Sequence, residues 1–240
     1  MQSKSHWLLA IAIICLGGAA GFLAAHLARV ARTQGVVDTS PTPPPAALTE
    51  EEQPKQEPAS DGRSGTKPVP AVLPDISLAD AEGVKHKLSQ WKGRPLMINF
   101  WATWCEPCRR EIPLLKRLRH ERAAEGLEIV GIAVDFRDAV QHYSREMGID
   151  YPVLIGEQDG LDAIAAFGMD TVFPFTVFVD AQGRIVTLKI GELREDEGHF
   201  ILDVVQSIDR GQTDPPAAKK QIADGMAALA AERARKEVHE

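Results

Sequence analysis

The sequence predicts an α/β fold in which helices flank a mixed β-sheet, preceded by an N-terminal β-hairpin extension. The first observation is an apolar run of strand type at 96–101 that passes directly into a helical pattern. The others are a second apolar strand at 127–134 and a strand pair within 175–190. Parallel strands need crossover helices and hairpins give antiparallel pairs, so this order predicts a sheet of mixed direction.

The remaining elements follow in chain order. Residues 74–78 and 84–88 flank the turn Ala81-Glu82-Gly83 and are expected to form the hairpin extension. The turn Asp180-Ala181-Gln182-Gly183 separates the two strands of the later pair. Helical patterns are expected after the first strand and at three later segments, 139–147, 161–167 and 200–208. Together these elements predict a folded domain at 69–209.

Composition limits the function classes. The chain has 240 residues, 44% of them hydrophobic, which is ordinary for a protein that buries a core. Its net charge of -7 and the lack of a basic cluster argue against a nucleic-acid partner. Three cysteines are too few for a disulfide scaffold, and two of them have C-x-x-C spacing, which is typical of redox or metal chemistry.

The N-terminal residues 1–32 are predicted to form a membrane anchor. Trp7 to Ala25 is a run of nineteen uncharged residues, nearly long enough as a helix to cross the roughly 30 Å hydrocarbon layer. A cleaved signal peptide is the alternative, although the run exceeds the usual ~7–15 residues and no clean cleavage site ends it. Cys15 lies inside this run and is interpreted as a passive side chain.

Two further segments lie outside the predicted domain. Residues 33–68 are rich in proline and glutamate and poor in large apolar residues, so we expect a disordered tether. Residues 210–240 form an alanine-rich tail that is expected to be helical or disordered. Ile222, Met226 and Leu229 would share one face of a solvated helix, which Gly225 would interrupt.

The sequence Trp104-Cys105-Glu106-Pro107-Cys108 carries the predicted chemistry. It follows a buried strand and opens a helix, where the helix dipole and free backbone N–H groups favour the reactive thiolate. Cys105 is therefore expected to attack, and Cys108 to resolve the mixed disulfide formed with a substrate. Pro107 suits the first helical turn because its missing N–H would have had no partner there.

Half of a zinc site is the alternative interpretation of C-x-x-C. Such a site needs two more ligands, and the chain has neither a second C-x-x-C nor an H-x3-5-H pair among His86, His120, His142 and His199. No metal and no cofactor are predicted.

The segment Asn99-Phe-Trp-Ala-Thr-Trp-Cys-Glu-Pro-Cys-Arg-Arg-Glu-Ile-Pro113 resembles the core signature of the TlpA/ResA-like branch of the thioredoxin superfamily. The resemblance extends over about 72–208. It implies a thioredoxin-like fold and a membrane-anchored thiol-disulfide oxidoreductase that reduces protein disulfides, for example during cytochrome c maturation. It also implies that a thiol-transport protein in the membrane donates electrons to this protein. It further implies a single-pass inner-membrane location with the catalytic domain in the periplasm.

The resemblance assigns further site residues. Pro174 corresponds to a cis-proline that faces the cysteines, and its neighbour Phe173 would offer backbone groups to an extended substrate. Glu111, one helical turn after Cys108, corresponds to a carboxyl that exchanges protons with Cys108. Trp104, Glu106 and Pro107 are expected to contact the substrate together with Phe173. Many thioredoxins have a buried aspartate where this chain has Asn99, which shifts the proton relay toward Glu111 or water.

Two other functions remain as alternatives. A peroxiredoxin-like peroxidase shares the fold but has the signature P-x-x-x-T-x-x-C, and this chain has Ile98 and Ala102 at the proline and threonine positions. A redox-linked scaffold or chaperone would hold client chains without catalysis, and its client binding would survive the loss of both sulfurs.

Overall fold

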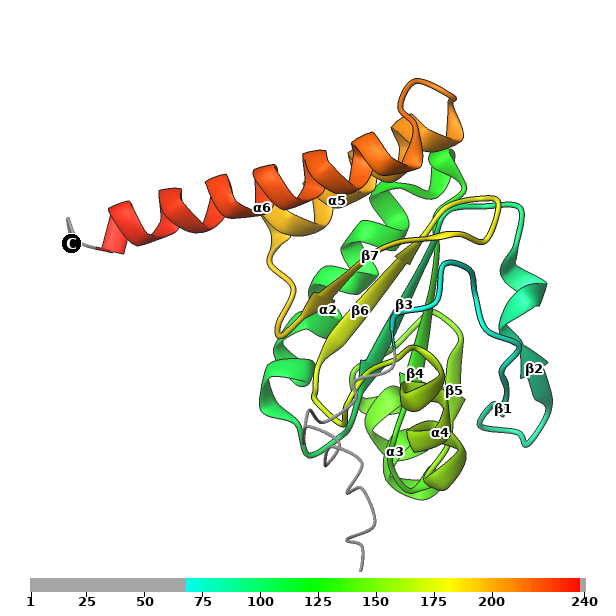
Figure 1. The fold of residues 1–240 in the computed structure, drawn as a ribbon. Helices are drawn as coiled ribbons and strands as arrows, with labels where there is room; N and C mark the ends of the chain where they lie inside the picture. Colours follow the sequence, from blue (N-terminus) through cyan, green and yellow to red (C-terminus); the bar gives the residue numbers. More distant parts are fainter. Residues whose placement is uncertain (1–67, 238–240) are drawn as a thin grey trace, which may run out of the picture. The chain divides into compact units, whose positions relative to one another are not determined.

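The computed structural model describes residues 68–237 (Figure 1). The predicted anchor, Cys15 and all but the last residue of the predicted tether lie outside these residues. Within 68–237, no helix is both long enough and apolar enough to span a bilayer.

One seven-stranded mixed sheet organises the described residues, in the order β2-β1-β5-β4-β3-β6-β7. β3, β4 and β5 run parallel to one another, and β6 and β7 add an antiparallel pair beside β3. β1 pairs antiparallel with both β2 and β5, so the predicted hairpin extension is confirmed and lies at the other edge. The strand bounds are β1 Ser77–Ala79, β2 Lys85–Lys87, β3 Leu96–Trp101, β4 Glu128–Ala133, β5 Val153–Ile155, β6 Phe175–Val179 and β7 Ile185–Ile190.

Five α-helices and two short 3-10 helices lie between or after these strands within 68–237. The predicted helices are all present with longer bounds, and the last predicted one begins five residues earlier, at an acidic first turn. The sequence analysis missed β5, which has only three residues. The helices are η1 Leu88–Trp91, α2 Glu106–Glu121, η2 Ala123–Glu125, α3 Arg137–Glu146, α4 Gln158–Ala166, α5 Glu195–Asp209 and α6 Pro215–Glu237.

The core has apolar layers on both faces of the sheet. On one face, Phe100 of β3 stacks on Phe175 of β6 at 4.3 Å between ring centroids and meets Phe167, beside the end of α4, edge to face. On the other face, α2, α5 and α6 pack over strand residues such as Met97 and Phe178. All six residues of β3 are buried. The loop after β3 is thus fixed between two packed layers, and it carries the cysteine motif.

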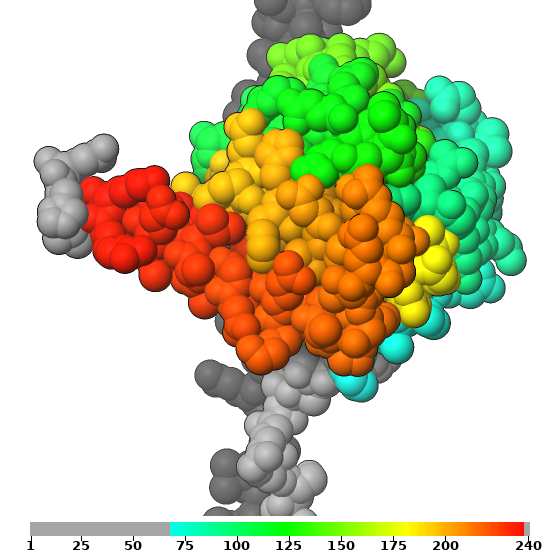
Figure 2. Space-filling model, turned by 90° about the horizontal axis from the view of Figure 1, so that it is seen from above, coloured from blue at the N-terminus to red at the C-terminus, as the bar shows by residue number. Residues whose placement is uncertain are grey.

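The C-terminal tail is an ordered helix that packs on the domain. Figure 2 shows α6 (orange to red) lying over α5. Ile222 is buried in the same apolar cluster as α5 residues, and Arg233 forms ion pairs with Asp196 and Glu197. The expected interruption at Gly225 is wrong: the helix is continuous, and a Cβ at this position would overlap the Phe200 ring of α5. Glycine here permits close packing of the two helices.

Candidate active site

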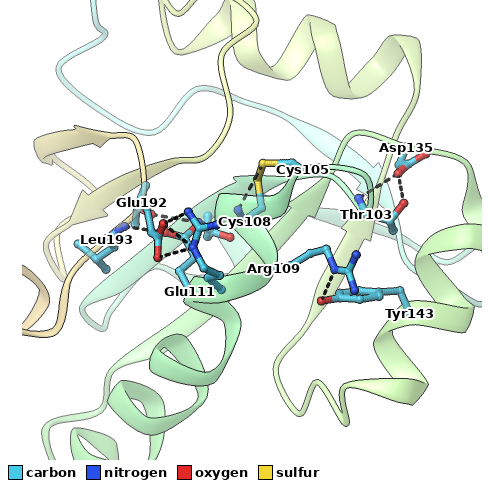
Figure 3. Close-up of a disulfide and its surroundings, with 12 residues drawn as sticks. Thr103, Cys105, Cys108, Arg109, Glu111, Asp135, Tyr143, Glu192 and Leu193 are labelled. Atoms are coloured by element: carbon cyan, nitrogen blue, oxygen red, sulfur yellow. Dashed lines mark hydrogen bonds and ion pairs between the residues drawn. A yellow bond between two sulfur atoms is a disulfide. The ribbon is translucent and has the colours of Figure 1, made fainter.

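The two cysteines of the motif lie at the N-terminus of α2 and form a disulfide (Figure 3). Cys105 is the N-cap residue, and its Sγ accepts a hydrogen bond from the Cys108 N–H at 3.3 Å. Cys108 is fully buried, whereas Cys105 keeps 6% of its surface exposed. Because a substrate sulfur must reach the attacking thiolate, this difference in exposure supports the expected order of the two residues.

The loop that precedes α2 is fixed by an acidic side chain in the loop that follows β4. Asp135 accepts hydrogen bonds from the N–H and the hydroxyl of Thr103, the first at 3.0 Å (Figure 3). These bonds join the loop after β3 to the loop after β4. The sequence analysis did not identify Thr103 or Asp135, since an acid and a hydroxyl 32 positions apart give no local pattern.

A shallow surface cleft adjoins Cys105. Its volume is about 510 Å³, and four predicted substrate-contact residues line it with Cys105. Trp104 is 67% exposed, and its ring meets the Phe173 ring edge to face at 5.7 Å between centroids. An exposed tryptophan packed against a half-buried phenylalanine beside a reactive sulfur offers apolar contact area to a polypeptide. The lining residues are Trp104, Cys105, Glu106, Pro107, Thr171, Val172 and Phe173.

Pro174 follows the cleft residues and precedes β6. The Phe173–Pro174 peptide bond is cis, as the resemblance implied. The Pro174 carbonyl accepts a hydrogen bond from the Gly191 N–H at 2.8 Å. Residues far apart in the sequence, around Cys105 and Pro174, therefore lie at one site.

Glu111 is a buried carboxyl on the helix that carries the cysteines. It is only 1% exposed, and at a spacing of three residues it shares a helix face with Cys108. Asn99 Nδ2 donates to one carboxyl oxygen at 2.7 Å, and the Leu193 N–H donates to the other at 2.8 Å. Burial raises the pKa of Glu111 to about 7, against the lowering effect of these two hydrogen bonds. The alternative of an exposed carboxylate on the helix is therefore wrong.

Asn99 also connects Glu111 to the neighbouring strand β6. Its amide nitrogen also donates to the Thr176 hydroxyl of β6 at 3.1 Å, and all of these side chains are buried. The sequence analysis missed Thr176, although a single hydroxyl within the apolar strand Phe175–Val179 was a usable signal. It also missed Leu193, because a backbone N–H donor leaves no trace in residue type.

Among residues 68–237, no group of three or more His, Cys, Asp or Glu side chains is arranged to hold a metal ion. The chemistry that the described site offers is that of two sulfurs and one carboxyl. The thiolate form of Cys105 can open a disulfide, and Glu111 can hold or release a proton near neutral pH.

Known proteins share this fold and this chemistry. The model of the AhpC/TSA family matches residues 69–188. The thiol-disulfide oxidoreductase ResA of Geobacillus thermodenitrificans is 30% identical over 130 residues, which cover 54% of this chain and 73% of that protein. ResA of Bacillus subtilis is 29% identical over 135 residues, with 55% and 73% covered.

Solved structures agree with these relatives. A secreted thiol-disulfide isomerase from Corynebacterium glutamicum superposes with a TM-score of 0.51 at 28% identity, covering 57% of this chain and 85% of that chain. The thioredoxin-like fold expected from the sequence is thereby confirmed. The chain belongs to the AhpC/TSA family and, within the thioredoxin superfamily, is a thiol-disulfide oxidoreductase of the TlpA/ResA-like branch.

Proposed function

We propose that the protein reduces disulfide bonds of extracytoplasmic proteins through a dithiol formed by Cys105 and Cys108. The observation that carries this proposal is the arrangement at the start of α2. Cys105 opens on an apolar cleft, while Cys108 and Glu111 are buried behind it on the same helix. One sulfur thus meets a polypeptide substrate, and the other is held beside a proton carrier.

The reaction begins with the reduced protein. The Cys105 thiolate attacks one sulfur of the substrate disulfide, forming a mixed disulfide and releasing the other substrate sulfur as a thiolate that takes up a proton. The Cys108 thiol gives its proton to the Glu111 carboxylate. Its thiolate then attacks Cys105 Sγ, which closes the Cys105–Cys108 disulfide and releases the second substrate thiolate. Two electrons pass to the substrate, and an external dithiol must restore the protein.

Glu111 suits this step because of its environment. A carboxyl with a pKa of about 7 accepts and releases a proton near neutral pH, which an exposed carboxylate with a pKa near 4.5 does poorly. Asn99 and the Leu193 N–H fix the direction of its two oxygens. Asn99 itself cannot take up a proton at neutral pH, so the relay passes to Glu111.

The proposal includes a location and an electron source. The uncharged run Trp7 to Ala25 supports a single-pass inner-membrane anchor, and the resemblance to membrane-anchored disulfide reductases supports a catalytic domain in the periplasm. A membrane thiol-transport protein would then supply electrons in that oxidising compartment. Apocytochrome c is the proposed substrate that best fits the resemblance to cytochrome c maturation thioredoxins.

The reduction potential of the Cys105–Cys108 pair tests the direction of electron flow. If the protein is a reductant, equilibration of the full-length protein with glutathione or dithiothreitol buffers should give a potential more negative than about -200 mV. A value near about -120 mV, which is typical of a strong protein oxidant, would reverse the proposed direction. In a variant without Cys15, all the thiols that are measured belong to Cys105 and Cys108.

A topology reporter tests the location. Alkaline phosphatase, which folds only outside the cytoplasm, is fused after residue 70, and the fusion is expected to be active. The matched fusion lacking residues 1–32 should be inactive, because nothing would export it. An inactive fusion to the intact N-terminal segment, present in the membrane fraction, would place the domain inside the cell.

The peroxidase alternative has a structural obstacle. Its signature requires proline at position 98, and Ile98 pairs with Val130 and Val177 in the middle of the sheet. A proline there would remove a backbone donor from the ladder. The chain therefore matches the AhpC/TSA family, but its sequence at the site differs from the peroxidase signature.

A further inference from the structure

One loop contacts the active site at two points. It connects β7 to α5 and consists of residues 191–194. The Gly191 N–H donates to the Pro174 carbonyl at 2.8 Å, and the Leu193 N–H donates to Glu111 Oε2 at 2.8 Å. The same short segment thus touches the cis-proline and the buried carboxyl, which the sequence separates by 63 positions (174 − 111).

Two charged side chains hold this loop. Arg110 of α2 forms a forked ion pair with Glu192: its Nε lies 3.2 and 3.0 Å from the two carboxylate oxygens, and its Nη2 donates to one of them as well. Lys189 Nζ donates to the carbonyls of Ile190 and Glu192 at 3.1 and 3.3 Å. Arg110 directly precedes Glu111, and Glu192 directly precedes Leu193. The ion pair and the Leu193–Glu111 hydrogen bond are therefore adjacent links between the same two segments.

We propose that the Arg110–Glu192 ion pair positions the loop 191–194 against α2 so that the Leu193 N–H stays bonded to Glu111 and water stays away from that carboxyl. Arg110 and Glu192 are positioning residues, and they act through Leu193 and Glu111. The effect on catalysis rests on the proposed function of Glu111 as the proton partner of Cys108. The effect on the loop itself does not depend on it.

The direction in which the pKa of Glu111 shifts can distinguish a positioning role of the ion pair from a purely electrostatic effect of its two charges. The charged or titratable groups that act on it are Glu192 of the loop, Lys189 of β7 and Tyr151 before β5. Arg110, the residue before Glu111, carries the positive charge of the ion pair with Glu192. If the loop opens, Glu111 gains hydration, which lowers its pKa, and loses the Leu193 N–H bond, which raises it. Burial is the larger of the two causes, so the net pKa falls. The Glu192 charge also raises this pKa, so its removal acts in the same direction.

The two single variants therefore distinguish the mechanisms. If the ion pair positions the loop, Arg110→Gln and Glu192→Gln both lower the pKa of Glu111, and Glu192→Gln lowers it more. If only charge matters, the signs are opposite: Glu192→Gln lowers the pKa, but Arg110→Gln raises it by removing a nearby positive charge. The pH dependence of insulin disulfide reduction, with dithiothreitol as electron donor, reports this pKa.

Hydrogen exchange measures the loop directly. Full-length protein is followed by mass spectrometry with fragmentation that resolves the Leu193 amide. Exposed ion pairs are worth little, so exchange of this amide should become about two- to fivefold faster in each single variant. The double variant Arg110→Glu/Glu192→Arg, which restores a pair with exchanged charges, should return the amide toward the parent rate.

The chain offers a matched control. Arg117 of α2 and Glu195, the first residue of α5 after the loop, form an exposed ion pair at 3.1 Å, and the side-chain hydrogen bond of this pair joins these two residues and no residue of 191–194. Arg117→Gln and Glu195→Gln should leave the Leu193 amide and the pH profile unchanged. Unchanged Leu193 exchange in Arg110→Gln and Glu192→Gln would overturn the positioning role, even if Glu111→Gln changes the pH profile. Faster exchange with a pH profile insensitive to Glu111→Gln would support the positioning role and refute the proton role of Glu111.

Discussion

Cys108→Ala is expected to accumulate covalent complexes with substrate proteins, whereas Cys105→Ala is expected to form few. The reason is geometric: Cys105 opens on the cleft that the aromatic side chains line, and Cys108 is fully buried. Without Cys108, the mixed disulfide on Cys105 has no internal thiolate to release it. Both variants should lose reductase turnover completely. Non-reducing gels of acid-quenched cells, with and without dithiothreitol, count the complexes.

A third variant controls this experiment. Replacing both cysteines by alanine should remove all complexes that dithiothreitol releases, because no site sulfur is left. Clients that remain bound to this double variant would instead support the scaffold or chaperone function. Equal trapping by Cys105→Ala and Cys108→Ala would contradict the assignment of Cys105 as the attacking sulfur.

Glu111→Gln is expected to change how the reactivity of the thiols depends on pH. An ionised carboxyl beside Cys108 opposes formation of a second negative charge, so the neutral amide should lower the thiol pKa values. Glu111 has a pKa of about 7, so it carries that charge mainly above this pH. The alkylation profiles of parent and variant should therefore differ above about pH 7 and converge below it. The amide also stores no proton, so the pH dependence of disulfide reduction should change.

Glu106→Gln is the matched control for this charge. Glu106 lies between the two cysteines in the sequence, but its side chain is 80% exposed, so solvent screens it. Its replacement should shift the alkylation profile much less than Glu111→Gln. Profiles of the parent and Glu111→Gln that superimpose would show that the proton comes from solvent.

The sequence was sufficient for the parts of the site that depend on local pattern. A buried strand followed at once by a helix places Cys105 at an N-cap, and the helical spacing places Glu111 on the face of Cys108. Pro174, Phe173 and the role of Glu111 were found through the resemblance, since a proline before a strand and a carboxyl on a helix are both common. The strand β5 was missed because three residues show no periodicity.

The links that complete the site were beyond sequence analysis. The Leu193 N–H reaches Glu111 across 82 positions, and any residue except proline would supply that donor. Arg110 and Glu192 are charged residues of ordinary appearance until the fold brings them together. Gly225 shows the reverse case, in which propensity predicted a break and tertiary packing determined the outcome.

The unequal exposure of the two sulfurs also bears on oxidative damage. A peroxide that reaches the dithiol form meets Cys105 first and converts its thiolate to a sulfenic acid. Cys108, three residues further along the helix, can condense with it, releasing water and forming the same disulfide that substrate turnover produces. Oxidation of the pair thereby stops at a recoverable disulfide before the irreversible sulfinic and sulfonic acids, and an external dithiol can reduce that disulfide again.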